Sequence, residues 1–160
     1  MRNRAAMHRS TKIVGDVVKT YLKFAKGKLG ITFAVDVEAA TELAAAYRAA
    51  GVPAEVVSAK TPDLLRQRIL KQFKRRELLQ LVNVDLFGEG FDLPACEVVT
   101  MVRKTESKNL FDQQLGRMLR LMVGDYHMDR WDSYSVAERL AIIAASPKPF
   151  GLLIDHVNNF

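Results

Sequence analysis

Cysteine is almost absent from this chain of 160 residues, since Cys96 is the single one. One cysteine cannot form an internal disulfide or a cysteine-clustered zinc site. Three histidines, at positions 8, 127 and 156, are scattered along the chain, and we expect no metal site from them. Cys96 lies in an apolar stretch, which predicts a buried, unreactive side chain.

Long apolar runs are also missing. No run approaches the ~18 residues of a membrane-spanning helix, and the basic segment 1–9 is not followed by the apolar stretch of a signal peptide. We therefore expect a cytoplasmic chain with no membrane segment. Length and composition, with 49% apolar and 26% charged residues, are those of one globular domain. We expect a basic lead-in at 1–10 and a single domain at 11–160.

Acidic residues are in the minority: 24 lysines and arginines face 18 aspartates and glutamates, for a net charge of +6. An excess of positive charge favours a polyanionic partner, because cations displace counterions from a phosphate backbone. Part of the excess belongs to the lead-in, so charge alone does not establish nucleic-acid binding.

Apolar periodicity alternates between short buried runs and amphipathic segments. It predicts strands at 29–35, 54–58, 78–84, 97–102 and 151–155, and helices at 11–25, 37–50, 62–75, 108–122 and 135–145. Asp36 and Thr61 are expected to cap helices, and Leu65, Ile69 and Phe73 to be buried by one of them. Such alternation is typical of an α/β fold with a parallel sheet covered on both faces. Residues 123–149 fit it least well and are interpreted as an insertion.

Ligands of such sheets bind beyond the carboxyl ends of the strands. A dinucleotide-binding or methyltransferase fold would need a glycine-rich turn after the first strand. Residues 35–40 contain no glycine, which argues against that alternative.

The helix predicted after Ser107 has two contrasting faces at 100° per residue. The core side carries Phe111, Leu115, Met118, Leu119 and Met122, and the opposite side carries Gln113, Gly116, Arg117 and Arg120. The second set has the spacing Q-x-x-G-R-x-x-R and resembles motif VI of superfamily 2 helicases.

Four further segments resemble the same family in the same order. Residues 30–35 resemble motif IV, residues 82–94 resemble motif V, and Arg66 matches the arginine helix between them; residues 153–158 resemble the closing strand. The resemblance implies the C-terminal RecA-like lobe of a DEAD/DEAH-type helicase, closest to bacterial and phage repair helicases. Its fold would be a three-layer sandwich of the P-loop NTPase type.

The resemblance also implies roles for individual residues. Arg117 and Arg120 would be arginine fingers for the γ-phosphate of ATP, supported by Gln113. Asp92 would accept a hydrogen bond from the ATP ribose, while Gly90 and Gly116 would allow close approach of the backbone.

Nucleic-acid contacts are implied at three strand ends. The residues concerned are Thr32, Lys60, Thr61, Asn83, Val84 and Asp85. Val84 lacks the hydroxyl that many relatives carry at this position. DNA is preferred to RNA as the substrate, because RNA helicases have arginine at the position of Glu89 and histidine at that of Gln113.

The sequence has neither the G-x-x-x-x-G-K-[S/T] loop for ATP phosphates nor the acidic motif for Mg²⁺. ATP and Mg²⁺ would then be held mainly by an N-terminal RecA-like lobe of the same protein, and this lobe alone is expected to be inactive. The alternative is a stand-alone nucleic-acid-binding or regulatory module without ATPase activity.

Overall fold

The computed structural model describes residues 4–84, 96–104, 112, 116 and 120–159. The elements are α1 (Arg4–Phe24), β1 (Gly30–Phe33), α2 (Val37–Ala49), β2 (Ala54–Ser58), α3 (Asp63–Lys74), β3 (Gln80–Val84), β4 (Val98–Met101), α5 (Asp125–Met128), the 3-10 helix η1 (Trp131–Ser133), α6 (Val136–Ala144) and β5 (Leu152–Asp155). No helix among these residues is both long and apolar enough to cross a bilayer.

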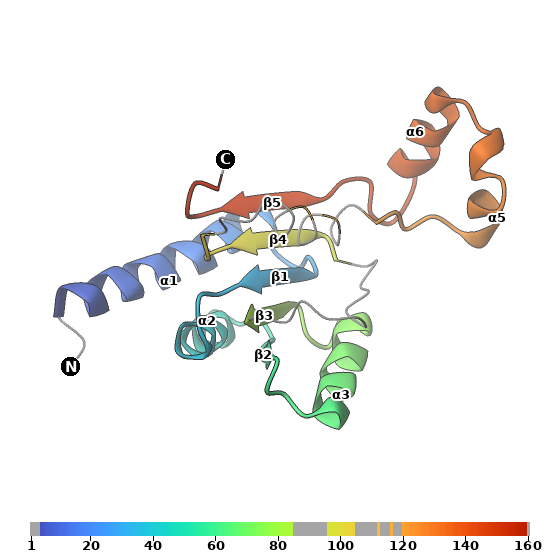
Figure 1. Ribbon diagram of the computed structural model, residues 1–160. Coiled ribbons are helices and arrows are strands. Elements are labelled where there is room, and N and C mark those ends of the chain that lie inside the picture. The colour runs from blue at the N-terminus through green and yellow to red at the C-terminus, as the bar shows by residue number, and fades with distance from the viewer. Residues whose placement is uncertain (1–3, 85–95, 105–111, 113–115, 117–119, 160) are drawn as a thin grey trace.

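The five strands form one parallel sheet in the order β2-β3-β1-β4-β5. Helices α1 and α2 cover one face of the sheet and α3 covers the other (Figure 1). Their buried side chains belong to two separate core clusters, one on each face. This arrangement confirms the predicted α/β fold with helices on both faces. It also explains why the central strands are apolar throughout, since both of their faces are buried.

Local signals set the ends of α2 as predicted. The Asp36 carboxylate accepts a hydrogen bond from the Ala39 N–H at 2.7 Å and caps the helix. At the other end Gly51 has φ +78°, a conformation that glycine adopts without steric cost.

The start of α3 differs from the prediction. Pro62 is the N-cap residue and makes no side-chain capping bond. The Thr61 hydroxyl instead accepts a hydrogen bond from the Ser58 N–H at 2.9 Å. Leu65 is 46% exposed, while Ile69 and Phe73 are buried as predicted.

Two helix boundaries also differ. The first helix begins at Arg4 instead of about residue 11, because the preceding residues include the good helix formers Arg, Ala and Met. The helix predicted at 108–122 includes residues 112 and 116, but residues 120–123 are not helical. There the chain leaves the helical pattern to enter the next segment.

That segment, residues 124–146, is called the appendage. It contains α5, η1 and α6 and stands away from the sheet, beyond the amino ends of β4 and β5 (Figure 1). The predicted helix at 135–145 is confirmed, and Ser135 and Glu138 form a capping box at its start. None of the residues of these three helices is buried.

Candidate nucleotide and nucleic-acid interface

The carboxyl ends of β1 and β3 lie side by side, with Phe33 in register with Asn83. Thr32 lies within this edge of the sheet but is fully buried. Its hydroxyl lies 3.1 Å from the Tyr47 hydroxyl and donates to Gln80 Oε1 at 3.3 Å. That hydroxyl therefore belongs to a polar network in the core and is not exposed at the sheet edge. The nucleic-acid contact predicted at Thr32 stays a prediction.

The end of β3 is also buried. Asn83 and Val84 are 2% and 4% exposed, and the Asn83 carbonyl accepts a hydrogen bond from the Ala34 N–H at 3.0 Å. Asn83 Oδ1 is buried without a hydrogen-bond partner among the described residues. The side chains of Asn83 and Val84 are thus not exposed at this strand end. Asp85 lies outside the described residues, and the phosphate contact predicted here stays a prediction.

Lys60 and Thr61 form the turn between β2 and α3, where Lys60 is exposed and Thr61 is half-buried. Arg66 fixes the turn, since its Nη2 donates to the Thr61 carbonyl at 3.0 Å and its Nη1 lies 3.5 Å from Asp63 Oδ1. The turn therefore holds the Lys60 ammonium at the surface, as the prediction of a phosphate contact requires.

A groove of about 420 Å³ runs from this turn between β2 and α3. We call it the α3 groove. Its lining residues are Glu55, Val56, Ser58, Lys60, Thr61, Pro62, Leu65, Arg68, Ile69 and Gln72. Sequence reasoning did not find Arg68 and Gln72, although their spacing of four residues on an amphipathic helix places them on one side.

Strand β2 is an edge of the sheet, and side chains bind two of its backbone groups. Arg48 Nη1 donates to the Ala54 carbonyl at 2.8 Å, and Thr61 accepts from the Ser58 N–H. Occupied edge groups do not recruit a further strand. The α3 groove is therefore better suited to side-chain recognition than to strand addition.

The residues predicted to face ATP are only partly described. Gln113, Arg117, Gly90 and Asp92 lie outside the described residues, whereas Gly116 is an exposed helical residue. Arg120 is exposed and lies beyond the helix. It borders a pocket of about 160 Å³ that is also lined by Leu121, Ile143, Lys148, Pro149, Phe150 and Gly151.

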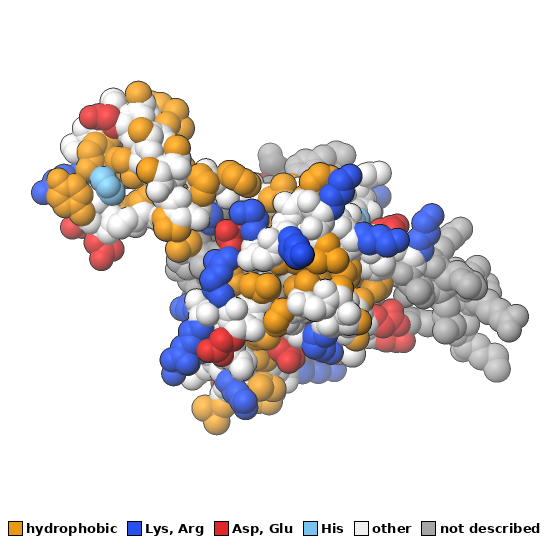
Figure 2. Space-filling view, turned by 180° about the vertical axis from the view of Figure 1, so that it is seen from behind, with side chains coloured by type: hydrophobic (Ala, Val, Ile, Leu, Met, Phe, Trp, Pro, Cys, Tyr) orange, Lys and Arg blue, Asp and Glu red, His pale blue; other side chains and the backbone are white. Residues whose placement is uncertain are grey.

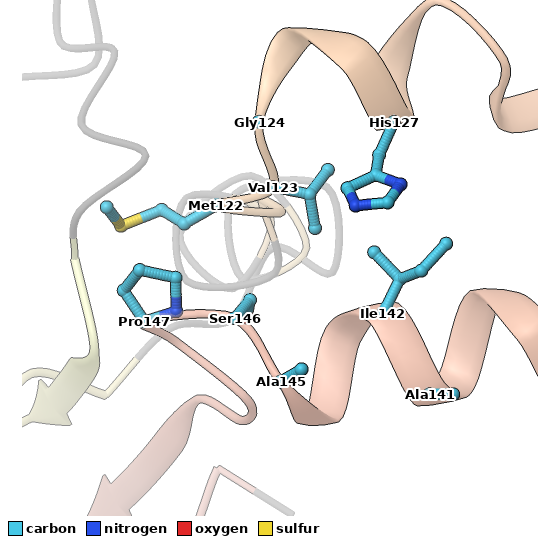
Figure 3. Close-up of a pocket in the computed structure, with 9 residues that line it drawn as sticks. All are labelled: Met122, Val123, Gly124, His127, Ala141, Ile142, Ala145, Ser146 and Pro147. Carbon is cyan, nitrogen blue, oxygen red and sulfur yellow. The ribbon is translucent and has the colours of Figure 1, made fainter.

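A larger pocket of about 440 Å³ lies between residues 122–127, where the appendage begins, and residues 141–147, at the end of α6 and just after it. Figure 3 shows Val123, His127 and Ile142 directed toward one another. His127 Nδ1 lies 3.2 Å from the Tyr134 hydroxyl. Most of the lining is apolar, so this pocket suits an apolar group better than a phosphate.

At the amino edge of the sheet, Glu97 joins several elements. Its Oε2 accepts from the Leu29 N–H at 2.9 Å and from Arg76 Nη2 at 3.0 Å, and its Oε1 lies 3.5 Å from Lys28 Nζ. Cys96 beside it is fully buried, and burial raises the pKa of its thiol to about 11. The prediction of a buried cysteine is confirmed.

Comparison with known proteins agrees with this architecture. The family model "Helicase conserved C-terminal domain" matches residues 13–122. A 51.5 kDa protein of Lactococcus phage (isolate 7-9) is 43% identical over 108 residues, covering 68% of this chain and 24% of that protein. IRC3 of Saccharomyces cerevisiae, whose name marks it as an inferred ATP-dependent helicase, is 30% identical over 152 residues, covering 92% of this chain and 22% of that protein.

Among solved structures, domain 2 of the DEAD-box helicase Mss116p, bound to an RNA duplex, superposes with a TM-score of 0.61. The identity is 18%, and the match covers 91% of this chain and 50% of that one. Fold and motif order together define a RecA-like C-terminal lobe of the superfamily 2 type. The chain belongs to the helicase conserved C-terminal domain family. It spans about a quarter of the length of the curated relatives it matches.

Proposed function

We propose that this chain is the C-terminal motor lobe of an ATP-dependent helicase or translocase. The observation that carries the proposal is the family match over residues 13–122, which include all the segments predicted to contact ATP and nucleic acid. ATP would lie in a cleft between this lobe and an N-terminal RecA-like lobe. Closure of the cleft around ATP would then move the strand contacts of the two lobes relative to each other.

In this proposal Arg117 and Arg120 stabilise the charge that develops on the transferred γ-phosphoryl group. A guanidinium offers planar paired donors to phosphate oxygens, and such a finger accounts for about 10³–10⁵-fold in rate in related phosphoryl transfers. The exposed position of Arg120 supports this role, because a finger has to reach a ligand held by another lobe. Gln113 and Gly116 would contribute to the same site.

Mg²⁺ would supply charge neutralisation on the β- and γ-phosphates. Within the described ranges no group of three His, Cys, Asp or Glu side chains is placed to hold a metal ion. The cationic Arg120 suits the phosphates rather than the metal. We therefore assign Mg²⁺ and most of the ATP contacts to the N-terminal lobe, with Asp92 and Gly90 contributing to the ribose and backbone contacts from this lobe.

Nucleic acid would cross the carboxyl edge of the sheet. Lys60 and Thr61 would contact phosphates through their side chains, and residues 83–85 through backbone groups. The Mss116p domain bound to an RNA duplex supports the idea that a lobe of this fold can hold a nucleic acid. From the residues at positions 89 and 113 we expect DNA to be preferred here.

The test is nucleic-acid-stimulated ATP hydrolysis by the longer natural protein, with this chain alone for comparison. We expect no turnover by this chain alone. In the longer protein, Arg117→Ala and Arg120→Ala should each lower turnover by about 10³-fold or more while a fluorescent ATP analogue still binds. Arg130→Ala, which removes an exposed arginine of the appendage, is the matched control and should retain turnover. Normal turnover in both finger variants would contradict the finger role, and a longer protein that hydrolyses no ATP would favour the stand-alone binding module instead.

A further inference from the structure

Helix α3 contains Arg66, which matches the family's arginine helix, and it also carries a line of cations at other positions. Arg68, Lys71 and Arg75 are exposed. Their spacing of three and four residues places them within about 60° of one another on the helix surface, at 100° per residue. The line is about 10 Å long, at 1.5 Å per residue.

Among the described residues, few carboxylates balance this line. Asp63 pairs with Arg66, which lies on another side of the helix, at 3.5 Å. Glu77 approaches Arg75 at 3.9 Å between two exposed side chains, a contact that adds little in water. Like charges three or four residues apart destabilise a helix, so an anion along this face would relieve their repulsion.

The α3 groove lies directly beside the line. Arg68 and Gln72 line it from the helix, and Lys60 lines it from the turn after β2. Its single carboxylate among the lining residues is Glu55, near the opposite end of β2 from that turn. Lysine and arginine side chains gather along this flank of the molecule, at the lower left of Figure 2.

We propose that α3 and its groove form a second track for the phosphodiester backbone of a nucleic acid. The track begins at Lys60 and continues along Arg68, Lys71 and Arg75. It rests on the proposed function, because Lys60 also belongs to the strand contacts proposed at the carboxyl edge. A line of separated cations suits a polymer with regularly spaced charges rather than a single nucleotide.

Contacts of this kind are independent of base sequence and sensitive to salt. Each phosphate neutralised on a single strand changes the slope of log K against log salt by about 0.7. Three cations of the track should therefore account for a slope of about two. The contribution should be similar on DNA and RNA, because the two share the phosphodiester group.

The test measures binding of the 160-residue chain to fluorescent single-stranded oligo-dT and oligo-U by anisotropy at several salt concentrations. One variant combines Arg68→Gln, Lys71→Gln and Arg75→Gln. The matched control combines Lys19→Gln, Lys23→Gln and Lys26→Gln, three exposed cations on or next to α1, and changes the net charge equally. Thermal melts confirm that both variants remain folded.

We expect the α3 variant to bind more weakly and to lose about two units of salt slope, with the control close to wild type. Equal losses in the two variants would overturn the track, because net charge alone would then explain binding. Full affinity in the α3 variant, with a loss in Lys60→Gln, would overturn the track and leave the proposed edge contacts standing. A wild-type chain that binds neither oligonucleotide would also overturn it, whereas the proposed ATP role is judged separately by turnover.

Discussion

Helices α2 and α6 are both short, apolar and capped at their first turn, yet they lie in opposite environments. In α2 four residues are buried, namely Ala40, Leu43, Ala44 and Tyr47, whereas α6 has none. Caps and propensity favour a helix, but packing of one face supplies most of its stability in a protein. We call the sheet with α1, α2 and α3 the body. The comparison shows that the body is stabilised by burial, and the appendage mainly by local contacts.

Aromatic residues show the same contrast. In the body Tyr21 and Tyr47 meet edge to face at 5.6 Å between ring centroids, and both are fully buried. In the appendage Arg130 lies 4.0 Å from the Tyr126 ring centroid and Arg139 lies 5.5 Å from that of Trp131. Cation–π contacts near water contribute less than buried aromatic packing, so the appendage should open before the body unfolds.

The largest difference is expected from one matched pair of truncations. Leu43→Ala removes a side chain that is 1% exposed in α2, and Leu140→Ala removes one that is 61% exposed in α6. The first should lower the free energy of unfolding by about 2–5 kcal/mol because it leaves a cavity. The second should change it by less than about 0.5 kcal/mol. Urea denaturation followed by circular dichroism measures both, and equal losses would contradict the comparison.

A smaller effect is expected at Glu97, which is 8% exposed. It also holds Arg76, which has φ +62°, a conformation unusual for a residue with a side chain. Glu97→Gln keeps an acceptor for the Leu29 N–H but loses the charge, and should cost about 1.5 kcal/mol of unfolding free energy. Glu138→Gln in the exposed capping box is the control, for which global unfolding should not change. A loss at Glu97 no larger than at Glu138 would show that the buried carboxylate does not tie the strands together.

The helix caps give a third pair. Asp36→Ala and Ser135→Ala each remove one capping bond, at α2 and at α6. We expect the first to lower the global free energy of unfolding by about 1 kcal/mol. The second should leave the global transition in place and speed hydrogen exchange of the α6 amides. Hydrogen exchange measured by mass spectrometry separates the two outcomes. A shift of the midpoint of global unfolding by Ser135→Ala would contradict the independence of the appendage.

The smallest effect concerns pH. Burial lowers the pKa of His156, while Asp16 on α1 and Asp155 on β5 oppose that shift. A histidine that binds its proton more weakly when folded makes the protein lose stability as pH falls below its ordinary value of about 6.5. As pH falls from 7 to 5, the wild type should therefore lose unfolding free energy relative to His156→Gln. Denaturation curves at the two pH values measure it, and a difference independent of pH would contradict the assignment.

Periodicity predicted most of the fold. Alternating apolar runs located the five strands and most helices, because burial on both faces of a parallel sheet leaves a continuous apolar signal. Local chemistry predicted the cap at Asp36. It failed at Thr61, whose hydroxyl satisfies the edge of β2 instead, a partner that depends on tertiary structure.

The site was less accessible to sequence reasoning. Motif spacing indicated the family, which the comparisons confirm. Motif spacing did not show that the Thr32 side chain is buried. Its partners Tyr47 and Gln80 come from distant parts of the chain. Helical projection placed Arg120 on a helix, whereas the chain has already left the helix at that residue. Arg68, Lys71 and Arg75 of α3 match no motif, and the role proposed for them depends on the groove beside the helix, which sequence alone does not show.

The central claim is that Arg120 acts on ATP held by another lobe, and Arg120→Lys in the longer protein tests it most directly. Lysine keeps the charge but lacks the planar paired donors of arginine. We predict a fall in nucleic-acid-stimulated turnover of at least about 100-fold, with ATP affinity nearly unchanged, as expected for an interaction made in the transition state. Turnover close to that of the wild type would contradict the account, because Arg120 would then contribute no more than general positive charge.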